Sequence, residues 1–209
     1  MKAFYPIWLK KKNNMDDIIL EIENYAEIND VPIMQKRGIN FLCELIKKNK
    51  IKNILEIGSA IGYSSIKMAL VDKDIKVTTI ERDLNRYKEA VNNIKRCNLE
   101  EQINIILGDA LETNIEGMYD LIFIDAAKAQ YIKFFNKYKE NLNKNGIILS
   151  DNMSFHGLVE EKERIKNKNL RQLVNKIKRY IVFLEENTEF KTEFYKVGDG
   201  IAVSRRVED

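Results

Sequence analysis

The sequence predicts an α/β fold in which a mostly parallel, seven-stranded sheet is doubly wound with helices. Five short apolar runs rich in β-forming residues recur between positions 53 and 149, and amphipathic segments separate most of them. Near-continuous apolar strands that alternate with helices are typical of a parallel sheet covered on both faces, the Rossmann-like arrangement. Two further extended segments close the chain around a Gly-Asp-Gly turn, which predicts an antiparallel hairpin at the C-terminus.

The elements are predicted in a regular order. Two N-terminal helices, over 16–28 and 35–48, carry apolar residues at helical spacing, and Pro32 between them favours an extended backbone at Val31. The apolar strands are predicted at 53–57, 76–80, 103–107, 121–124 and 147–149. Helices are predicted at 64–70, 83–97, 131–142 and 170–186, and the hairpin at 190–197 and 201–204.

Length and composition indicate one domain in a chain of 209 residues. We expect residues 1–50 to form a helical cap on a sheet domain at 51–209. No apolar run reaches membrane-spanning length, and the N-terminus lacks the cleavage site of a secretory signal. Cys43 and Cys97 have no metal-site spacing and are expected to be buried, reduced thiols. These features favour a cytoplasmic protein that does not associate with membranes.

Charge is unevenly distributed, although the net charge of +3 does not itself indicate nucleic-acid binding. Residues 160–179 hold eight Lys or Arg against three Glu. Two explanations remain open at this level: a solvated helix face, or a surface that contacts phosphates.

A glycine-bearing turn follows the first predicted strand. Its spacing, Glu56-X-Gly58-X-X-X-Gly62, differs from the dinucleotide fingerprint. Gly58 is expected to adopt a conformation closed to other residues, Gly62 to let a ligand approach the backbone, and Ser64 to cap the next helix. Alone, such a turn could simply connect a strand to a helix.

Two later strand ends strengthen the nucleoside interpretation. Glu81 ends the second strand and is placed to accept both hydroxyls of a ribose. Gly108, Asp109 and Ala110 follow the third strand. Because open α/β sheets bind ligands beyond the carboxyl ends of their strands, these groups predict a nucleoside cofactor at that rim.

A candidate metal site lies at the next two strand ends. Asp125 follows the fourth strand, and Asp151 with Asn152 follows the fifth, so three oxygen donors are expected to converge. Such ligands suit Mg²⁺ or Ca²⁺ rather than zinc. Lys128 is expected one helical turn beyond Asp125, where a cation and partial burial favour the neutral amine that a general base requires. The alternatives are acids that cap helices or form surface pairs, and a solvated lysine.

These residues together resemble the metal-dependent, catechol-type O-methyltransferases that use S-adenosylmethionine, over about residues 25–205. Within that family the chain is most similar to the bacterial branch that methylates 5-hydroxyuridine in tRNA. The resemblance rests on Tyr25-Ala26 with Val31-Pro32-Ile33, the segment 56–64, Thr79-Ile80-Glu81-Arg82-Asp83, the segment 108–112, the segment 123–128, Ser150-Asp151-Asn152 and the segment 198–202.

The resemblance implies a role for each matching position. The cofactor-binding residues would be Val31, Ile33, Glu56, Gly58 and Ser64 at the methionine part, Glu81 at the ribose, Asp109 and Ala110 at the adenine, and Asp125. The ligands of Mg²⁺, or of another divalent cation, would be Asp125, Asp151 and Asn152, and Lys128 would be the catalytic base.

The resemblance also implies a substrate and an assembly. The acceptor would be 5-hydroxyuridine at the wobble position of a tRNA anticodon, which becomes 5-methoxyuridine, and the protein would be a homodimer. His156 departs from the branch, where a lysine is expected, and either contacts substrate or is a solvated loop residue. Residues 1–14 match no motif. A small-molecule catechol or phenol methyltransferase shares every motif, and a non-catalytic binding module is disfavoured because the metal and base residues are all present.

Overall fold

The structure is a computed structural model that describes residues 14–154, 157, 159 and 167–207. Its strands are β1 (Asn53–Ile57), β2 (Lys76–Glu81), β3 (Ile103–Leu107), β4 (Tyr119–Ile124), β5 (Leu142–Ser150), β6 (Phe190–Tyr195) and β7 (Ile201–Arg206). Its helices are α1 (Met15–Ile28), α2 (Lys36–Lys48), α3 (Tyr63–Ala69), α4 (Leu84–Arg96), α5 (Tyr131–Tyr138) and α6 (Lys168–Glu185). Two 3₁₀ turns, η1 (Lys128–Gln130) and η2 (Lys139–Asn141), flank α5.

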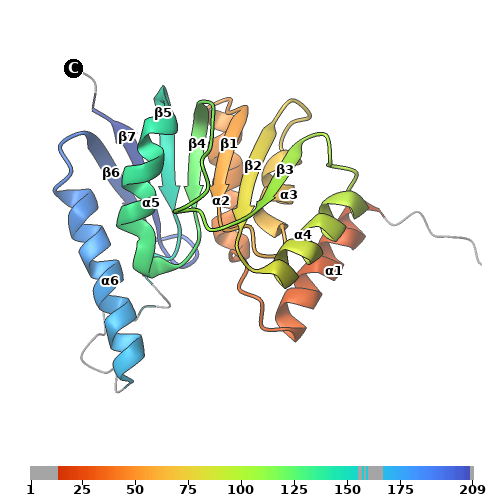
Figure 1. Ribbon diagram of the computed structural model, residues 1–209, viewed down its shortest axis with the longest axis horizontal. Helices are drawn as coiled ribbons and strands as arrows, with labels where there is room; N and C mark the ends of the chain where they lie inside the picture. The colour runs from red at the N-terminus through yellow and green to blue at the C-terminus, as the bar shows by residue number, and fades with distance from the viewer. Residues whose placement is uncertain (1–13, 155–156, 158, 160–166, 208–209) are drawn as a thin grey trace, which may run out of the picture.

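The seven strands form one sheet in the order β3-β2-β1-β4-β5-β7-β6, which Figure 1 displays from right to left. Strands β1 to β5 run parallel, whereas β7 pairs antiparallel with both β5 and β6. The predicted fold class is therefore confirmed. The strand order reverses direction between β1 and β4, and this topological switch point is where sheets of this type bind ligands.

Alternating strand residues build a core on each face of the sheet. Ile54 belongs to the core that packs against α1 to α4, and its neighbour Leu55 belongs to the core that packs against α5 and α6. Both are fully buried, as expected for central strands covered on both sides. No helix among the described residues is long and apolar enough to span a bilayer.

One predicted boundary is wrong. The helix expected to reach residue 142 ends at Tyr138, and Leu142 already belongs to β5. Leu142 pairs with Tyr119, and pairing resumes between Ile147 and Leu121 after a register shift. The intervening Asn-Lys-Asn-Gly segment has the composition of a turn, so local sequence does not reveal a strand that long-range pairing stabilises.

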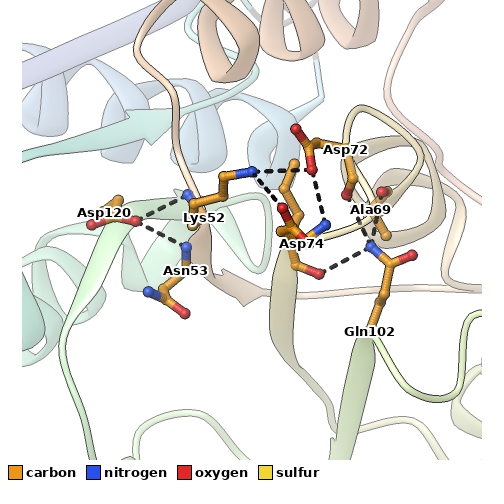
Figure 2. Close-up of polar contacts among 8 residues, drawn as sticks. Lys52, Asn53, Ala69, Asp72, Asp74, Gln102 and Asp120 are labelled. Carbon is orange, nitrogen blue, oxygen red and sulfur yellow. Dashed lines mark hydrogen bonds and ion pairs between the residues drawn. The ribbon is translucent and has the colours of Figure 1, made fainter.

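Polar contacts join the strands at the amino end of the sheet, opposite the predicted site (Figure 2). Asp120 accepts hydrogen bonds from the backbone N–H groups of Lys52 and Asn53, at 3.0 and 2.9 Å, and from Nδ2 of Asn143 at 2.6 Å. Burial alone would raise the pKa of Asp120, but these three donors hold it below its usual value. Nearby, Nε2 of Gln102 donates to three backbone carbonyls, of Ala69, Asp72 and Ile75.

Candidate active site

A cavity of about 510 Å³ opens at the carboxyl ends of the parallel strands. Its size is that of a small-molecule or cofactor site. It is lined by ten of the twelve predicted site residues: Ile33, Gly58, Ser64, Glu81, Asp109, Ala110, Asp125, Lys128, Asp151 and Asn152. The other two, Val31 and Glu56, do not line it; Val31 borders a neighbouring hollow against α1.

The turn after β1 presses against the end of β4. Gly58 has a φ of +96°, and a Cβ there would lie 2.3 Å from the carbonyl oxygen of Asp125. The expectation that only glycine fits this position is confirmed. Gly62 also has a positive φ, +82°, and a Cβ there would lie 3.3 Å from the Cβ of Ala90 in α4. Both the backbone conformation and the packing of α4 therefore favour glycine, and Gly62 does not line the cavity.

Ser64 does not cap α3, because Gly62 occupies the N-cap position and Ser64 lies inside the helix. Its hydroxyl instead donates to Glu56 at 2.5 Å. Ser65 and Thr79 donate to the same carboxylate, so Glu56 joins α3 and β2 beneath the turn. Burial raises the pKa of Glu56 to about 7, although the three hydroxyls act to lower it. Glu56 therefore connects the end of β1 to α3, which follows the glycine turn, and to β2 through hydrogen bonds.

Glu81 combines a fixed position with free acceptor capacity. One carboxylate oxygen accepts the N–H of Ala60 and the other accepts the N–H of Asp83, each at 2.8 Å. A carboxylate oxygen has two lone-pair sites, so each retains one, and Glu81 lines the cavity. This geometry suits a bidentate contact with the two hydroxyls of a ribose.

The predicted metal ligands meet at the ends of β4 and β5. Their backbones are held in register, since the N–H of Asp125 donates to Ile57 and the N–H of Asp151 donates to Ile124. Asn152 has a φ of +66° and places its amide between the two acids, 3.1 Å from Oδ1 of Asp125 and 3.2 Å from Oδ2 of Asp151. Asparagine adopts this left-handed backbone more readily than most residues, so the conformation suits the residue type.

The charge of this cluster fits a divalent cation. Burial raises the pKa of Asp151, and the nearby charge of Asp125 raises it further. Burial also raises the pKa of Asp125, while the Lys128 ammonium acts to lower it. Oδ1 of Asp151 is buried and accepts no hydrogen bond from the described residues. Turning the Asn152 amide would direct its oxygen inward and complete a set of hard oxygen donors.

The ligand set contains only two carboxylates. Within the described ranges, no three or more His, Cys, Asp or Glu side chains form a cluster that could hold a metal. The site would therefore depend on the Asn152 amide and leave positions for water or substrate, as Mg²⁺ sites commonly do.

Lys128 begins η1 and lines the cavity. The expectation that Lys128 lies one helical turn beyond Asp125 is wrong, because residues 125–127 are not helical. The chain still brings the lysine to the metal cluster, where its charge acts on both acids. The non-helical segment 125–127 thus brings Lys128 close to Asp125 and Asp151.

Asp199 is a site residue for which the sequence analysis predicted no role. It is 5% exposed, lines the cavity, and raises the pKa of both Asp125 and Asp151. The turn between β6 and β7 brings it there, because its carbonyl accepts the N–H of Ser154 and the Gly200 carbonyl accepts the N–H of Met153. The Gly-Asp-Gly spacing predicts the turn, but it does not reveal that the turn packs beside Asp125 and Asp151, which lie much earlier in the chain.

Several predicted features fall outside the described residues. They are His156, residues 1–13, and the first part of the basic segment, including Lys162, Arg164 and Lys166. The second part forms α6, which carries Lys168, Arg171, Lys176, Lys178 and Arg179 against a single acid, Glu185. Helix α6 packs against η1, the turn that carries Lys128.

Comparisons with known proteins agree with this geometry. Residues 12–207 match the protein family described as O-methyltransferase. The chain is 28% identical over 194 residues to a caffeoyl-CoA O-methyltransferase of Populus kitakamiensis, which covers 88% of this chain and 82% of the relative.

Solved structures extend the likeness to the whole fold. A provisionally assigned caffeoyl-CoA O-methyltransferase from Staphylococcus aureus is 41% identical, with a TM-score of 0.87, and covers 90% of this chain and 92% of its own. A Podospora anserina methyltransferase bound to S-adenosylhomocysteine shares the fold at 22% identity, with a TM-score of 0.83 and full coverage of both chains. The match across nearly the whole chain, together with a nucleoside-sized cavity at the switch point, places this protein in the S-adenosylmethionine-dependent O-methyltransferase family.

Proposed function

We propose that this enzyme methylates a hydroxyl group that stands beside a second oxygen, as in a catechol, with the help of a divalent cation. The observation that carries the proposal is the convergence of Asp125, Asp151 and Asn152 with Lys128 at one end of the cofactor cavity. Two neighbouring oxygens on the acceptor match a cation that keeps positions open for substrate.

The residues divide the chemical work. Asp125, Asp151 and Asn152 would hold the divalent cation, which would supply Lewis-acid stabilisation of the acceptor oxygen. Lys128 acts as the base in its neutral amine form, which a bound cation favours, and takes the proton of the hydroxyl. Glu81 holds the ribose so that the sulfonium faces the acceptor. The acceptor oxygen then attacks the methyl carbon in line: a C–O bond forms, the C–S bond breaks, and S-adenosylhomocysteine leaves.

A small-molecule catechol or phenol is the acceptor class that we favour. Relatives named as caffeoyl-CoA O-methyltransferases support it, because they cover most of this chain. To test it, the purified protein is incubated with S-adenosylmethionine, Mg²⁺ and either catechol or caffeoyl-CoA. We expect methylated product that disappears in excess EDTA and in Asp151→Ala, while calorimetry still detects S-adenosylhomocysteine binding to this variant. Full activity in EDTA would reject the role of the cation.

A second acceptor, 5-hydroxyuridine in tRNA, is supported by the charge of α6. Its five basic residues lie on the helix that packs against the Lys128 turn. A basic helix beside the site would attract the phosphates of a nucleic acid. Hydroxyuridine-containing tRNA is therefore assayed in parallel. This acceptor would be favoured over the small molecule if the tRNA is methylated and neither catechol nor caffeoyl-CoA is. Methylation of the tRNA should then fall steeply with salt and in Lys176→Glu and Arg179→Glu.

A further inference from the structure

The loop after β3 is fastened to α5 by one lysine. Nζ of Lys137 donates hydrogen bonds to three backbone carbonyls, those of Ala110 at 2.9 Å, Leu111 at 2.8 Å and Thr113 at 2.8 Å. A lysine ammonium has three N–H donors, so these bonds use all of them. Such saturated contacts are unusual for a side chain that normally remains solvated.

Tyr138, the next residue of α5, holds the same loop. Its ring is fully buried, and its hydroxyl donates to the carbonyl of Ala110 at 2.5 Å. The Ala110 oxygen thus accepts two bonds, one from each α5 residue, which fills both of its lone-pair sites. Phe134, one turn earlier on α5, lines the cavity. The helix therefore contributes to the cavity wall and also anchors the neighbouring loop.

The loop's own hydrogen bonds fix its shape. Oδ1 of Asp109 accepts the N–H of Leu111, and the carbonyl of Asp109 accepts the N–H and the hydroxyl of Thr113. These contacts stay inside the loop and do not set its position relative to the helix layer. The bonds from Lys137 and Tyr138 do, and they act on Ala110, which lines the cavity beside Asp109.

We propose that Lys137 is a positioning residue for the purine end of the cofactor, with Tyr138 as its second anchor. The proposal rests on the proposed function and on the expectation, from the sequence resemblance, that Asp109 and Ala110 border the adenine. A loop that is fixed before binding loses less conformational entropy when the ligand arrives, and it presents its polar groups in one arrangement. Without the anchor the loop keeps its internal bonds but is held less firmly against α5, so the ligand must fix its position, and both affinity and discrimination between purines fall.

The experiment compares two nucleosides in calorimetric titrations, S-adenosylhomocysteine and its analogue with hypoxanthine in place of adenine. Lys137→Met removes the three donors and keeps most of the side-chain stem. We expect about tenfold weaker binding of S-adenosylhomocysteine and a smaller preference for adenine over hypoxanthine. Lys137→Arg, which restores donors, should recover part of both. Lys133→Met, an exposed lysine on the same helix, is the matched control and should bind as wild type.

Two further measurements keep the outcome unambiguous. Thermal unfolding without ligand shows whether each variant folds, and Tyr138→Phe provides a milder change that keeps the buried ring and loses only the hydroxyl. Equal weakening toward both nucleosides, or unchanged binding by folded Lys137→Met, would overturn the positioning role. If wild type itself fails to bind S-adenosylhomocysteine, the proposed function falls and this proposal with it.

Discussion

At the scale of single residues, Glu81 links the glycine turn to the cavity in which we propose that the cofactor binds. Its two carboxylate oxygens accept the N–H groups of Ala60 and Asp83, and each retains one acceptor site. The sequence predicted this residue because an acid at the end of a strand points to the rim of the sheet. It did not predict the two backbone bonds, which arise from a turn whose conformation depends on Gly58 and the end of β4.

Glu81→Ala should weaken the binding of S-adenosylhomocysteine by about 2–3 kcal/mol, because two charge-assisted hydrogen bonds to the ribose are lost. Isothermal titration of the purified protein measures the change. Glu112→Ala removes an exposed acid in the loop after β3 and should bind as wild type. Equal dissociation constants for Glu81→Ala and wild type would place the ribose elsewhere.

Lys128 is expected to contribute to the chemical step far more than to substrate binding. Lys128→Met should lower kcat at least about 100-fold and change KM far less, because a general base acts on the chemical step. The deficit should shrink at higher pH, where the acceptor hydroxyl ionises without assistance. Steady-state kinetics across pH test this, with Lys133→Met as control. A rise in KM at constant kcat would make Lys128 a residue that only holds the substrate.

At the scale of elements, local pattern predicted most of the helices and strands, and contacts between elements explain the exceptions. Apolar periodicity placed β1 and β3 at their observed ranges. The early start of β5 was missed because its pairing partner, Tyr119, lies on another strand. The hydrogen bond of Ser64 was missed for a similar reason, because its partner Glu56 lies on β1, across the turn. Asp199 reaches the site only through the pairing of β7 with β5.

The connection of β1, β2 and α3 through Glu56 predicts a pH effect on stability. Burial raises the pKa of Glu56 from 4.5 to about 7, so the folded protein keeps this proton at pH values where the unfolded chain loses it. The stabilisation is complete below pH 4.5 and is lost as pH rises through 7, and it amounts to about 3 kcal/mol. Glu56→Gln cannot lose a proton and lacks this dependence.

Urea unfolding at several pH values, in the absence of ligands, measures the effect as a difference between wild type and Glu56→Gln. Wild type should lose stability relative to the variant between pH 4.5 and 8. Other titrating groups contribute to both proteins and cancel. Glu100→Gln, at an exposed position, should follow wild type. Parallel curves for wild type and Glu56→Gln would show that the carboxyl ionises in the fold as it does in the unfolded chain.

At the scale of the whole molecule, the two ends of the sheet have separate roles. The carboxyl ends of the strands carry the cavity and its buried acids, which repel one another. At the amino ends, Asp120 joins β4 to β1 and β5. Gln102, the residue before β3, donates to the turn before β2, and Figure 2 shows the contacts of Asp120 with Lys52 and Asn53 and those of Gln102. The sequence predicted the first end from strand-end motifs. It gave no signal for the second, because each contact joins residues more than 20 positions apart.

This division predicts that stability and function respond to different ends of the sheet. Asp120→Ala leaves the N–H groups of Lys52 and Asn53 without their acceptor, so the free energy of unfolding should fall by about 1–3 kcal/mol. Binding of S-adenosylhomocysteine, measured well below the unfolding transition, should not change.

Asp74→Ala, which removes an exposed ion pair with Lys52, should alter neither quantity measurably. Urea unfolding and titration calorimetry on the same preparations give both values. Loss of affinity in folded Asp120→Ala would mean that the two ends are coupled through the strands, because Asp120 and the cavity residue Asp125 lie at opposite ends of β4.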